Sequence, residues 1–244
     1  AMIRAILLNR PNILHTLKYL FENGADVNAR VKESHHTPLT AAAYKGSIKM
    51  VKFLIQNGAD VHKRSKEGHT PLISACNHHK NRSIELVDYL LNKGAKINAK
   101  NKYKQTAFLR AMRFSNFKIA RFLIEKGASI KGKAIWYGNK WKEAPLLIAA
   151  KEKNIPMVKL LIRKKVNLEL KGSSKKTTLL TLKIIRYNIR RLLKKKFRKV
   201  KPEVKKRYFK MARKDYKEFG KILRILHRAG AKNYRVKKKH LRGK

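Results

Sequence analysis

The chain has 244 residues and carries 63 Lys and Arg against 14 Asp and Glu, so its formal net charge is +49. Hydrophobic residues make up 43% of it, which is enough for a core and excludes a purely disordered basic tail. The single cysteine, Cys76, excludes an internal disulfide framework and a cysteine-rich zinc site. Without a long apolar run or a signal-peptide pattern, the sequence predicts an intracellular protein with no membrane partner.

A repeated pattern begins near the N-terminus. Gly-Ala pairs begin at Gly24, Gly58, Gly94 and Gly127, at spacings of 34, 36 and 33 residues. Thr-Pro-Leu stands at 37–39 and 70–72, and related triplets stand at 106–108 and 144–146. Between each triplet and the next Gly-Ala lie two apolar-periodic runs, which predict a short inner helix and a longer outer helix. A period of this length is typical of a solenoid.

The most complete copy of the pattern lies between residues 58 and 75. It contains Gly-Ala-Asp-Val at 58–61, Gly-His-Thr-Pro-Leu at 68–72 and Ala75. In these residues the chain resembles the ankyrin-repeat family, which implies an all-α solenoid of helix-turn-helix units with hairpin fingers. The residue types fit that fold, because Thr can cap a helix, Pro suits its first turn and Gly suits its C-terminal end. The resemblance also implies a scaffold that binds proteins on its fingers and inner helices.

Six units can be distinguished along the chain. They cover about 1–32, 33–66, 67–101, 102–132, 133–172 and 173–231. In the fifth unit, Lys165-Val166 replaces Gly-Ala, and we expect the loss of that glycine to lengthen or distort the end of the outer helix. We predict two domains, an ankyrin solenoid over 1–172 and an elaborated final repeat over 173–244 with basic helices and an extended C-terminal arm.

The positive charge is concentrated towards the C-terminus. Residues 171–244 hold 30 basic and 3 acidic residues, which is more than half of the net charge. Their apolar residues recur at helical spacing, which predicts amphipathic helices with the apolar face on the solenoid and the basic face outward. Pro202 suits the first turn of such a helix.

Each finger also carries Lys or Arg, and Tyr103 and a Trp-rich finger interleave with them. Stacked repeats would align these tips into one basic row, where cations hold phosphates and aromatic rings stack on unpaired bases. The candidate nucleic-acid-binding residues of the fingers are Arg30, Lys32, Lys63, Arg64, Lys66, Lys100, Lys102, Lys104, Lys131, Lys133, Trp136, Tyr137, Lys140, Trp141, Lys142, Lys175 and Lys176. Those of the C-terminal helices and arm are Arg190, Arg191, Lys194, Lys195, Arg198, Lys205, Lys206, Arg207, Lys210, Arg213, Lys237, Lys238 and Lys239.

Simpler interpretations of the same residues stay open. The finger charges could be an ordinary solvated surface, and Trp136 and Trp141 could plug a long loop. The pairs His35-His36 and His78-His79 do not predict a metal site, since adjacent residues rarely converge on one ion and no carboxylate cluster joins them. No phosphate-binding glycine motif, nucleophile elbow or paired catalytic carboxylate occurs, so we predict a protein that is not an enzyme and has no cofactor or small-molecule substrate.

The large positive charge favours nucleic-acid binding over the other classes of function. Nucleic acid is the partner whose negative charge density best matches this excess, which predicts a structural RNA-binding component of a large ribonucleoprotein. Organellar ribosomes include helical-repeat scaffolds, so a mitochondrial ribosomal protein that contacts rRNA and neighbouring proteins is our main hypothesis. The alternative is an ankyrin adaptor or effector that binds an acidic protein. A third possibility is packaging of DNA.

Overall fold

The computed structural model describes residues 1–8, 12–30, 36–77, 84–136, 141–168, 178, 181–183, 185 and 202–231. It divides into two compact units, residues 1–135 and residues 136–244. This division falls inside the enlarged finger of the fifth repeat. The predicted domain boundary at 172/173, which separates regular from elaborated repeats, stays a prediction.

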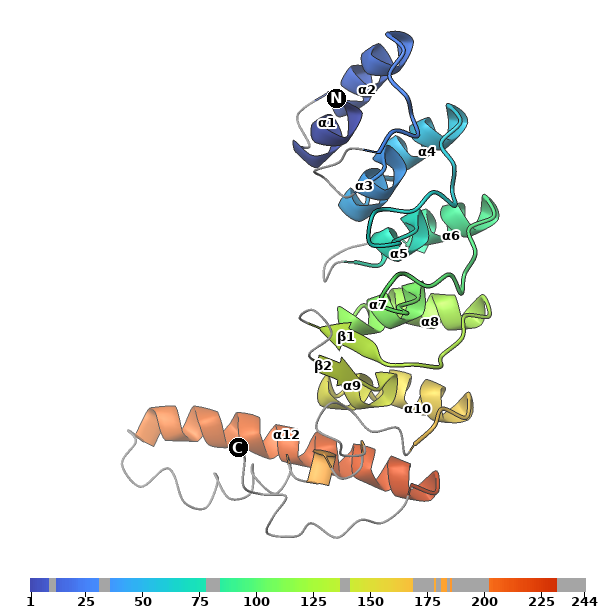
Figure 1. The fold of residues 1–244 in the computed structure, drawn as a ribbon. Helices are drawn as coiled ribbons and strands as arrows, with labels where there is room; N and C mark the ends of the chain where they lie inside the picture. Colours follow the sequence, from blue (N-terminus) through green and yellow to red (C-terminus); the bar gives the residue numbers. More distant parts are fainter. Residues whose placement is uncertain are drawn as a thin grey trace. The chain divides into compact units, whose positions relative to one another are not determined.

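Helix pairs build the first unit, as the repeat pattern predicted (Figure 1). The pairs are α1 (Met2–Leu8) with α2 (Ile13–Glu22), α3 (Pro38–Lys45) with α4 (Ile48–Gln56), α5 (Pro71–Ala75) with α6 (Ile84–Asn92), and α7 (Ala107–Arg113) with α8 (Phe117–Glu125). Inner helices α1, α3, α5 and α7 contact one another in sequence, and outer helices α2, α4, α6 and α8 do the same. The unit is therefore a two-layered all-α repeat stack, which confirms the predicted fold class.

The inner helices begin where the Thr-Pro-Leu motif predicted. The side chains of Thr37, Thr70 and Thr106 each accept a hydrogen bond from the backbone N–H three residues later, at 3.1, 3.2 and 3.3 Å. Pro38 and Pro71 occupy first-turn positions, where a missing N–H leaves no bond unmade. The following alanines of α3 are completely buried, and their small side chains let neighbouring helices approach closely.

The Gly-Ala pairs end the outer helices. Gly58 has a φ of 84°, a left-handed conformation that glycine adopts without steric cost. The N–H of Ala59 then donates to the carbonyl of Leu54 at 2.9 Å, and Ala59 is buried, with 7% of its surface exposed. Gly24, Gly94 and Gly127 repeat this conformation, which explains the period seen in the sequence.

The enlarged finger departs from the regular pattern. Strands β1 (Ala134–Trp136) and β2 (Trp141–Glu143) form a two-stranded sheet within the enlarged finger. The sequence indicated the enlargement but not the strand pairing. Helices α9 (Pro145–Lys151) and α10 (Ile155–Arg163) follow, and Leu146, Ala149 and Leu161 are among their fully buried residues.

The predicted distortion after α10 is wrong. Helix α10 has nine residues, the same length as α4, α6 and α8. Lys165 adopts the left-handed conformation, with a φ of 54°, and the N–H of Val166 donates to the carbonyl of Leu161 at 3.1 Å. The helix end thus keeps the geometry of the Gly-Ala ends because packing imposes it on a residue that does not favour it.

Helix α12 (Pro202–Arg228) begins at the proline that the sequence singled out. Phe219, Ile222 and Leu226 bury its apolar face, and the helix contacts α10 within the second unit. Lys153, at the turn between α9 and α10, reaches the carboxylate of Asp215 at 2.6 Å. The helix therefore packs by an apolar face, as its amphipathic pattern predicted.

Candidate functional site

Hydrogen bonds connect the first finger of the first unit to the second. The side-chain amide of Asn28 donates to the carbonyl of Gly58 at 2.8 Å. Its oxygen accepts from the N–H of Asp60 at 2.9 Å. One asparagine thus satisfies both a backbone donor and a backbone acceptor of the next finger. These two hydrogen bonds set the spacing between the two fingers.

The second and third fingers make closer contacts. The N–H of Lys102 donates to the carbonyl of Glu67 at 3.0 Å, and the guanidinium of Arg64 donates to the carbonyl of Lys100 at 2.6 Å. A Cβ added to Gly68, whose φ is 77°, would lie 3.1 Å from the nitrogen of Lys102. The fingers therefore approach at backbone distance, and only glycine fits at this position without strain.

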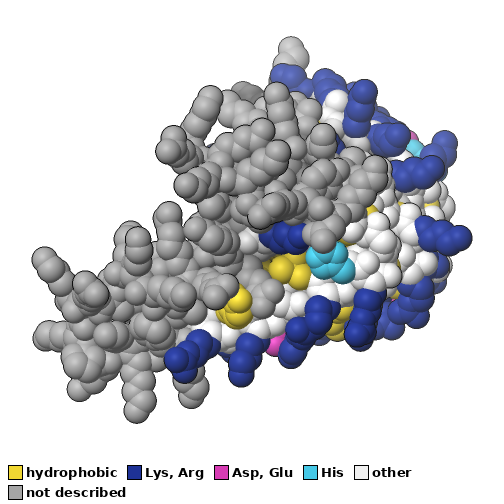
Figure 2. Space-filling view, turned by 90° about the horizontal axis from the view of Figure 1, so that it is seen from below, with side chains coloured by type: hydrophobic (Ala, Val, Ile, Leu, Met, Phe, Trp, Pro, Cys, Tyr) yellow, Lys and Arg dark blue, Asp and Glu magenta, His cyan; other side chains and the backbone are white. Residues whose placement is uncertain are grey.

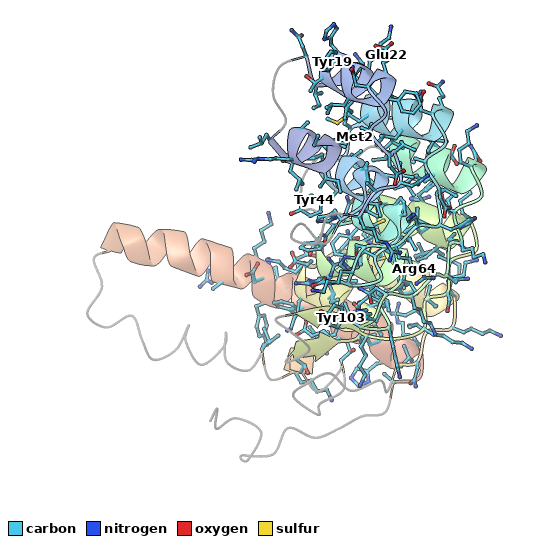
Figure 3. All side chains as sticks on the ribbon, turned by 45° about the horizontal axis from the view of Figure 1, so that its top comes forward. Met2, Tyr19, Glu22, Tyr44, Arg64 and Tyr103 are labelled. Carbon is cyan, nitrogen blue, oxygen red and sulfur yellow. The ribbon has the colours of Figure 1, made fainter. Side chains whose placement is uncertain are left out.

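The third finger is connected to the fourth in the same way. The N–H of Ser129 donates to the side-chain oxygen of Asn98 at 2.8 Å, and the amide of Gln105 donates to the carbonyl of Lys133 at 2.9 Å. Residues 26–30, 59–69, 95–105 and 128–133 consequently follow one another along one side of the first unit, and we call them the finger edge. Figure 3 shows Arg64 and Tyr103, which come from two successive fingers of this edge.

Basic side chains of the finger edge face solvent. Of the predicted residues, Arg30, Arg64, Lys66, Lys100, Lys102, Lys104 and Lys131 are exposed, while Lys63, Tyr103 and Lys133 are half-buried. Lys96, which was not predicted, is exposed as well. Among the described residues, none of these lysines and arginines forms an ion pair with an acid of the chain. The acids Asp26 and Asp60 accept from backbone N–H groups of their own turns. Ion pairs within the described residues therefore do not neutralise the positive charge of the edge.

The remaining predicted residues lie elsewhere or outside the described part. Trp136, Trp141 and Lys142 belong to the strands of the hairpin, and Lys205, Lys206, Arg207, Lys210 and the exposed Arg213 belong to α12. Outside the described residues lie Lys32, Tyr137, Lys140, Lys175, Lys176, Arg190, Arg191, Lys194, Lys195, Arg198, Lys237, Lys238 and Lys239. On the face drawn in Figure 2, Lys and Arg clearly outnumber acidic side chains over the described surface.

A second basic cluster lies on the inner helices, and sequence reasoning missed it. Arg110 of α7 is only 7% exposed and donates through Nη2 to the side-chain oxygen of Asn77. Burial and then the charge of Arg113 lower the pKa of Arg110 to about 10. The available signal was the contrast between repeats, because the equivalent positions after the two Thr-Pro-Leu motifs hold the small residues Ala41 and Ser74, and the one after the triplet at 144–146 holds the apolar Ile148.

His69 completes this cluster just before the α5 cap. The residue is 8% exposed, and its Nδ1 lies 3.9 Å from a carboxylate oxygen of Glu67. Burial, followed by the charges of Arg110, His36 and Arg113, lowers the pKa of His69 to about 4. The histidine is therefore neutral at physiological pH.

The described residues contain few other features with chemical significance. They include no group of three His, Cys, Asp or Glu that could hold a metal ion. None of their helices is both long enough and apolar enough to span a membrane. Cys76 is fully buried and His36 half-buried beside Tyr44, whereas His35, His78 and His79 lie outside the described part.

Comparison with known families agrees with the geometry. The family model for ankyrin repeats matches residues 1–65 and 61–134, which is more than half of the chain. No curated protein sequence matches the chain. The ankyrin fold is typically a scaffold without catalytic activity. The chain belongs to the ankyrin-repeat family, whose repeats form a protein–protein interaction module.

Proposed function

We propose that this ankyrin array binds an acidic protein through its finger edge. The observation that carries the proposal is the chain of hydrogen bonds between successive fingers, which holds exposed lysines and arginines in a fixed order along the first unit. A rigid row of cations favours a partner whose carboxylates have a matching spacing, and it accelerates their encounter. The family supplies the protein-binding role, and the charge supplies the class of partner.

The test uses charge reversal on the finger edge. Lys66 and Lys102 are exposed on successive fingers, so replacing both by Glu changes the edge without removing a hydrogen bond of their side chains. The matched control replaces Lys49 and Lys118, which are exposed on outer helices α4 and α8, and it makes the same change in net charge. The probe is a fluorescent deca-glutamate peptide, with binding to the full chain measured by anisotropy.

We expect the finger variant to weaken binding by about tenfold or more, because two like charges then oppose the peptide, and the control to weaken it far less. Equal losses in the two variants would contradict recognition at the finger edge and would indicate attraction by net charge alone. Thermal unfolding of both variants checks that the fold is intact.

A second candidate function rests on the other basic element. Helix α12 carries ten Lys and Arg residues against three acidic ones, and Phe219, Ile222 and Leu226 in its C-terminal part are buried. Such a helix suits phosphate binding, so the protein could instead be an RNA-binding component of a large ribonucleoprotein, with the mitochondrial ribosome as the proposed setting. Support for this candidate comes from charge alone.

The two candidates differ in what releases the protein from its complex. If RNA holds it, RNase treatment of a cell extract releases the protein while DNase does not, and binding to decauridylate falls steeply with salt. If an acidic protein holds it, neither nuclease releases it. Release by DNase alone would favour the packaging of DNA.

A further inference from the structure

A second group of basic side chains lies on inner helix α7 and just before inner helices α3 and α5, and its two arginines are not part of the finger edge. His36, His69, Arg110 and Arg113, together called the inner-face cluster, interact through their charges, since the last two and His36 all lower the pKa of His69. Within hydrogen-bonding or ion-pairing range, the acid near this cluster in the described residues is Glu67, at 3.9 Å from His69. The cluster therefore combines two guanidinium groups with the neutral imidazole of His69, and both Arg110 and His69 are buried.

Neighbouring side chains hold the two guanidinium groups in place. The Cζ atoms of Arg110 and Arg113 lie 5.4 and 5.0 Å from the centre of the Phe114 ring. Asn77 accepts a hydrogen bond from Arg110. Side chains that are ordered before binding lose less conformational entropy when a ligand arrives, so this arrangement favours binding.

Two buried nitrogen atoms of the cluster lack partners. In the described part of the chain, neither Nε of Arg110 nor Nε2 of His69 has a hydrogen-bonding partner. Both residues are more than nine-tenths buried. A buried polar group without a partner destabilises a fold, so such groups call for an explanation. A ligand that supplies an acceptor satisfies the N–H at Nε of Arg110, and it satisfies Nε2 of His69 in the form of the ring that carries a proton there.

We propose that the inner-face cluster binds one carboxylate side chain of an acidic partner protein. A carboxylate offers two oxygens in the geometry of a guanidinium fork, and its charge offsets the mutual repulsion of Arg110 and Arg113. Arg113 is half-buried and is the more accessible of the two. The inference rests on the proposed function and adds one anchoring contact on the inner helices to the row on the finger edge.

Burial favours a carboxylate over a phosphate of RNA. Arg110 and His69 expose only 7% and 8% of their surface, so a ligand has to reach them with a slender group. A Glu or Asp side chain is such a group, whereas a phosphodiester carries a ribose on each side. The cluster is thus suited to an acidic protein rather than to a polynucleotide.

The test measures deca-glutamate binding to the full chain at physiological salt, in the wild type and in Arg110→Lys. Lysine keeps the charge but loses the planar fork, so we expect binding to weaken by about tenfold. The control is Arg121→Lys, on the exposed surface of α8, where Arg121 pairs with Glu125 at 2.8 Å. We expect this control to bind the peptide like the wild type.

A second measurement needs no variant. Nuclear magnetic resonance follows the imidazole of His69 during a pH titration, with and without the peptide. A carboxylate beside the ring favours its charged form, so we expect bound peptide to raise the pKa of His69 from about 4 towards its ordinary value.

The outcomes separate this inference from the proposed function. If the peptide binds but neither the Arg110→Lys affinity nor the pKa of His69 changes, the inference is overturned and the finger-edge proposal stands. If the peptide does not bind the wild type, both are overturned. If decauridylate raises the pKa of His69 as much as the peptide does, the cluster accepts phosphate and the choice of carboxylate is wrong.

Discussion

The repeat formed by α7 and α8 and the repeat formed by α9 and α10 differ in the residues that define an ankyrin unit. The first has a Thr106 cap and a Gly127 end, while the second has Ala144, which makes no side-chain cap, and Lys165. Their inner helices have seven residues each and their outer helices nine. Signature residues thus lower the free energy of an arrangement that side-chain packing also enforces, and a single repeat can lose two of them.

The largest expected effect comes from removing a buried leucine from each repeat, which tests whether packing stabilises the two repeats to the same extent. Leu123 of α8 and Leu161 of α10 are fully buried, four residues before Gly127 and Lys165 respectively. Replacing either by Ala should lower the free energy of unfolding by about 3 kcal/mol, because each leaves a similar cavity. Hydrogen exchange read separately over the two units measures the losses. A much smaller loss at Leu161 would show that the irregular repeat is loosely packed.

The second largest expected effect is a loss of stability at low pH in the first unit, which contains His69. His69 has a pKa of about 4 in the folded chain against 6.5 when unfolded, so between these values the unfolded chain binds a proton that the folded chain does not. Stability of the first unit should therefore fall as pH drops from about 6.5 to 4, by roughly 2–3 kcal/mol in all. Denaturant titrations at several pH values measure this loss. His69→Gln should flatten the dependence in that window, and an unchanged slope would contradict the assignment.

The smallest effect comes from exchanging the helix-end residues. Lys165→Gly should stabilise the chain by roughly 0.5–1 kcal/mol, because glycine adopts the left-handed conformation without a steric penalty. Gly127→Lys should destabilise it by a similar amount, at a position where a new Cβ meets no atom within 4 Å. Thermal unfolding of both variants measures how much each substitution changes stability, and it compares the C-terminal ends of α8 and α10. A destabilised Lys165→Gly variant would mean that the lysine side chain makes a contact worth more than the strain.

Much of the fold could be predicted from local signals. Thr70-Pro71 and Gly58-Ala59 act within one helical turn, so each predicts its own helix start or end without knowledge of the rest. The finger edge was also predictable, because a regular period implies that equivalent loops become neighbours. The left-handed Lys165 could not be predicted, since its intrinsic preference opposes the conformation that packing imposes.

The inner-face cluster lay beyond sequence reasoning for a different reason. His69 precedes α5 and Arg110 lies within the next inner helix, and nothing in their spacing shows that both side chains turn into the same buried space. The pKa of His69 in particular depends on the charges of His36, which precedes α3, and of Arg110 and Arg113 on α7.

The sequence by itself determined the repeat, its period, the class of fold and the positive charge of the fingers, because these depend on local conformational preferences and on composition. The tertiary structure alone decided how closely the fingers approach, that Lys165 adopts a left-handed conformation, and that Arg110 and His69 are both buried and close enough for their charges to interact. Those features depend on side chains from separate repeats that meet only after the stack has formed, and their energies come from burial and from charges within that stack.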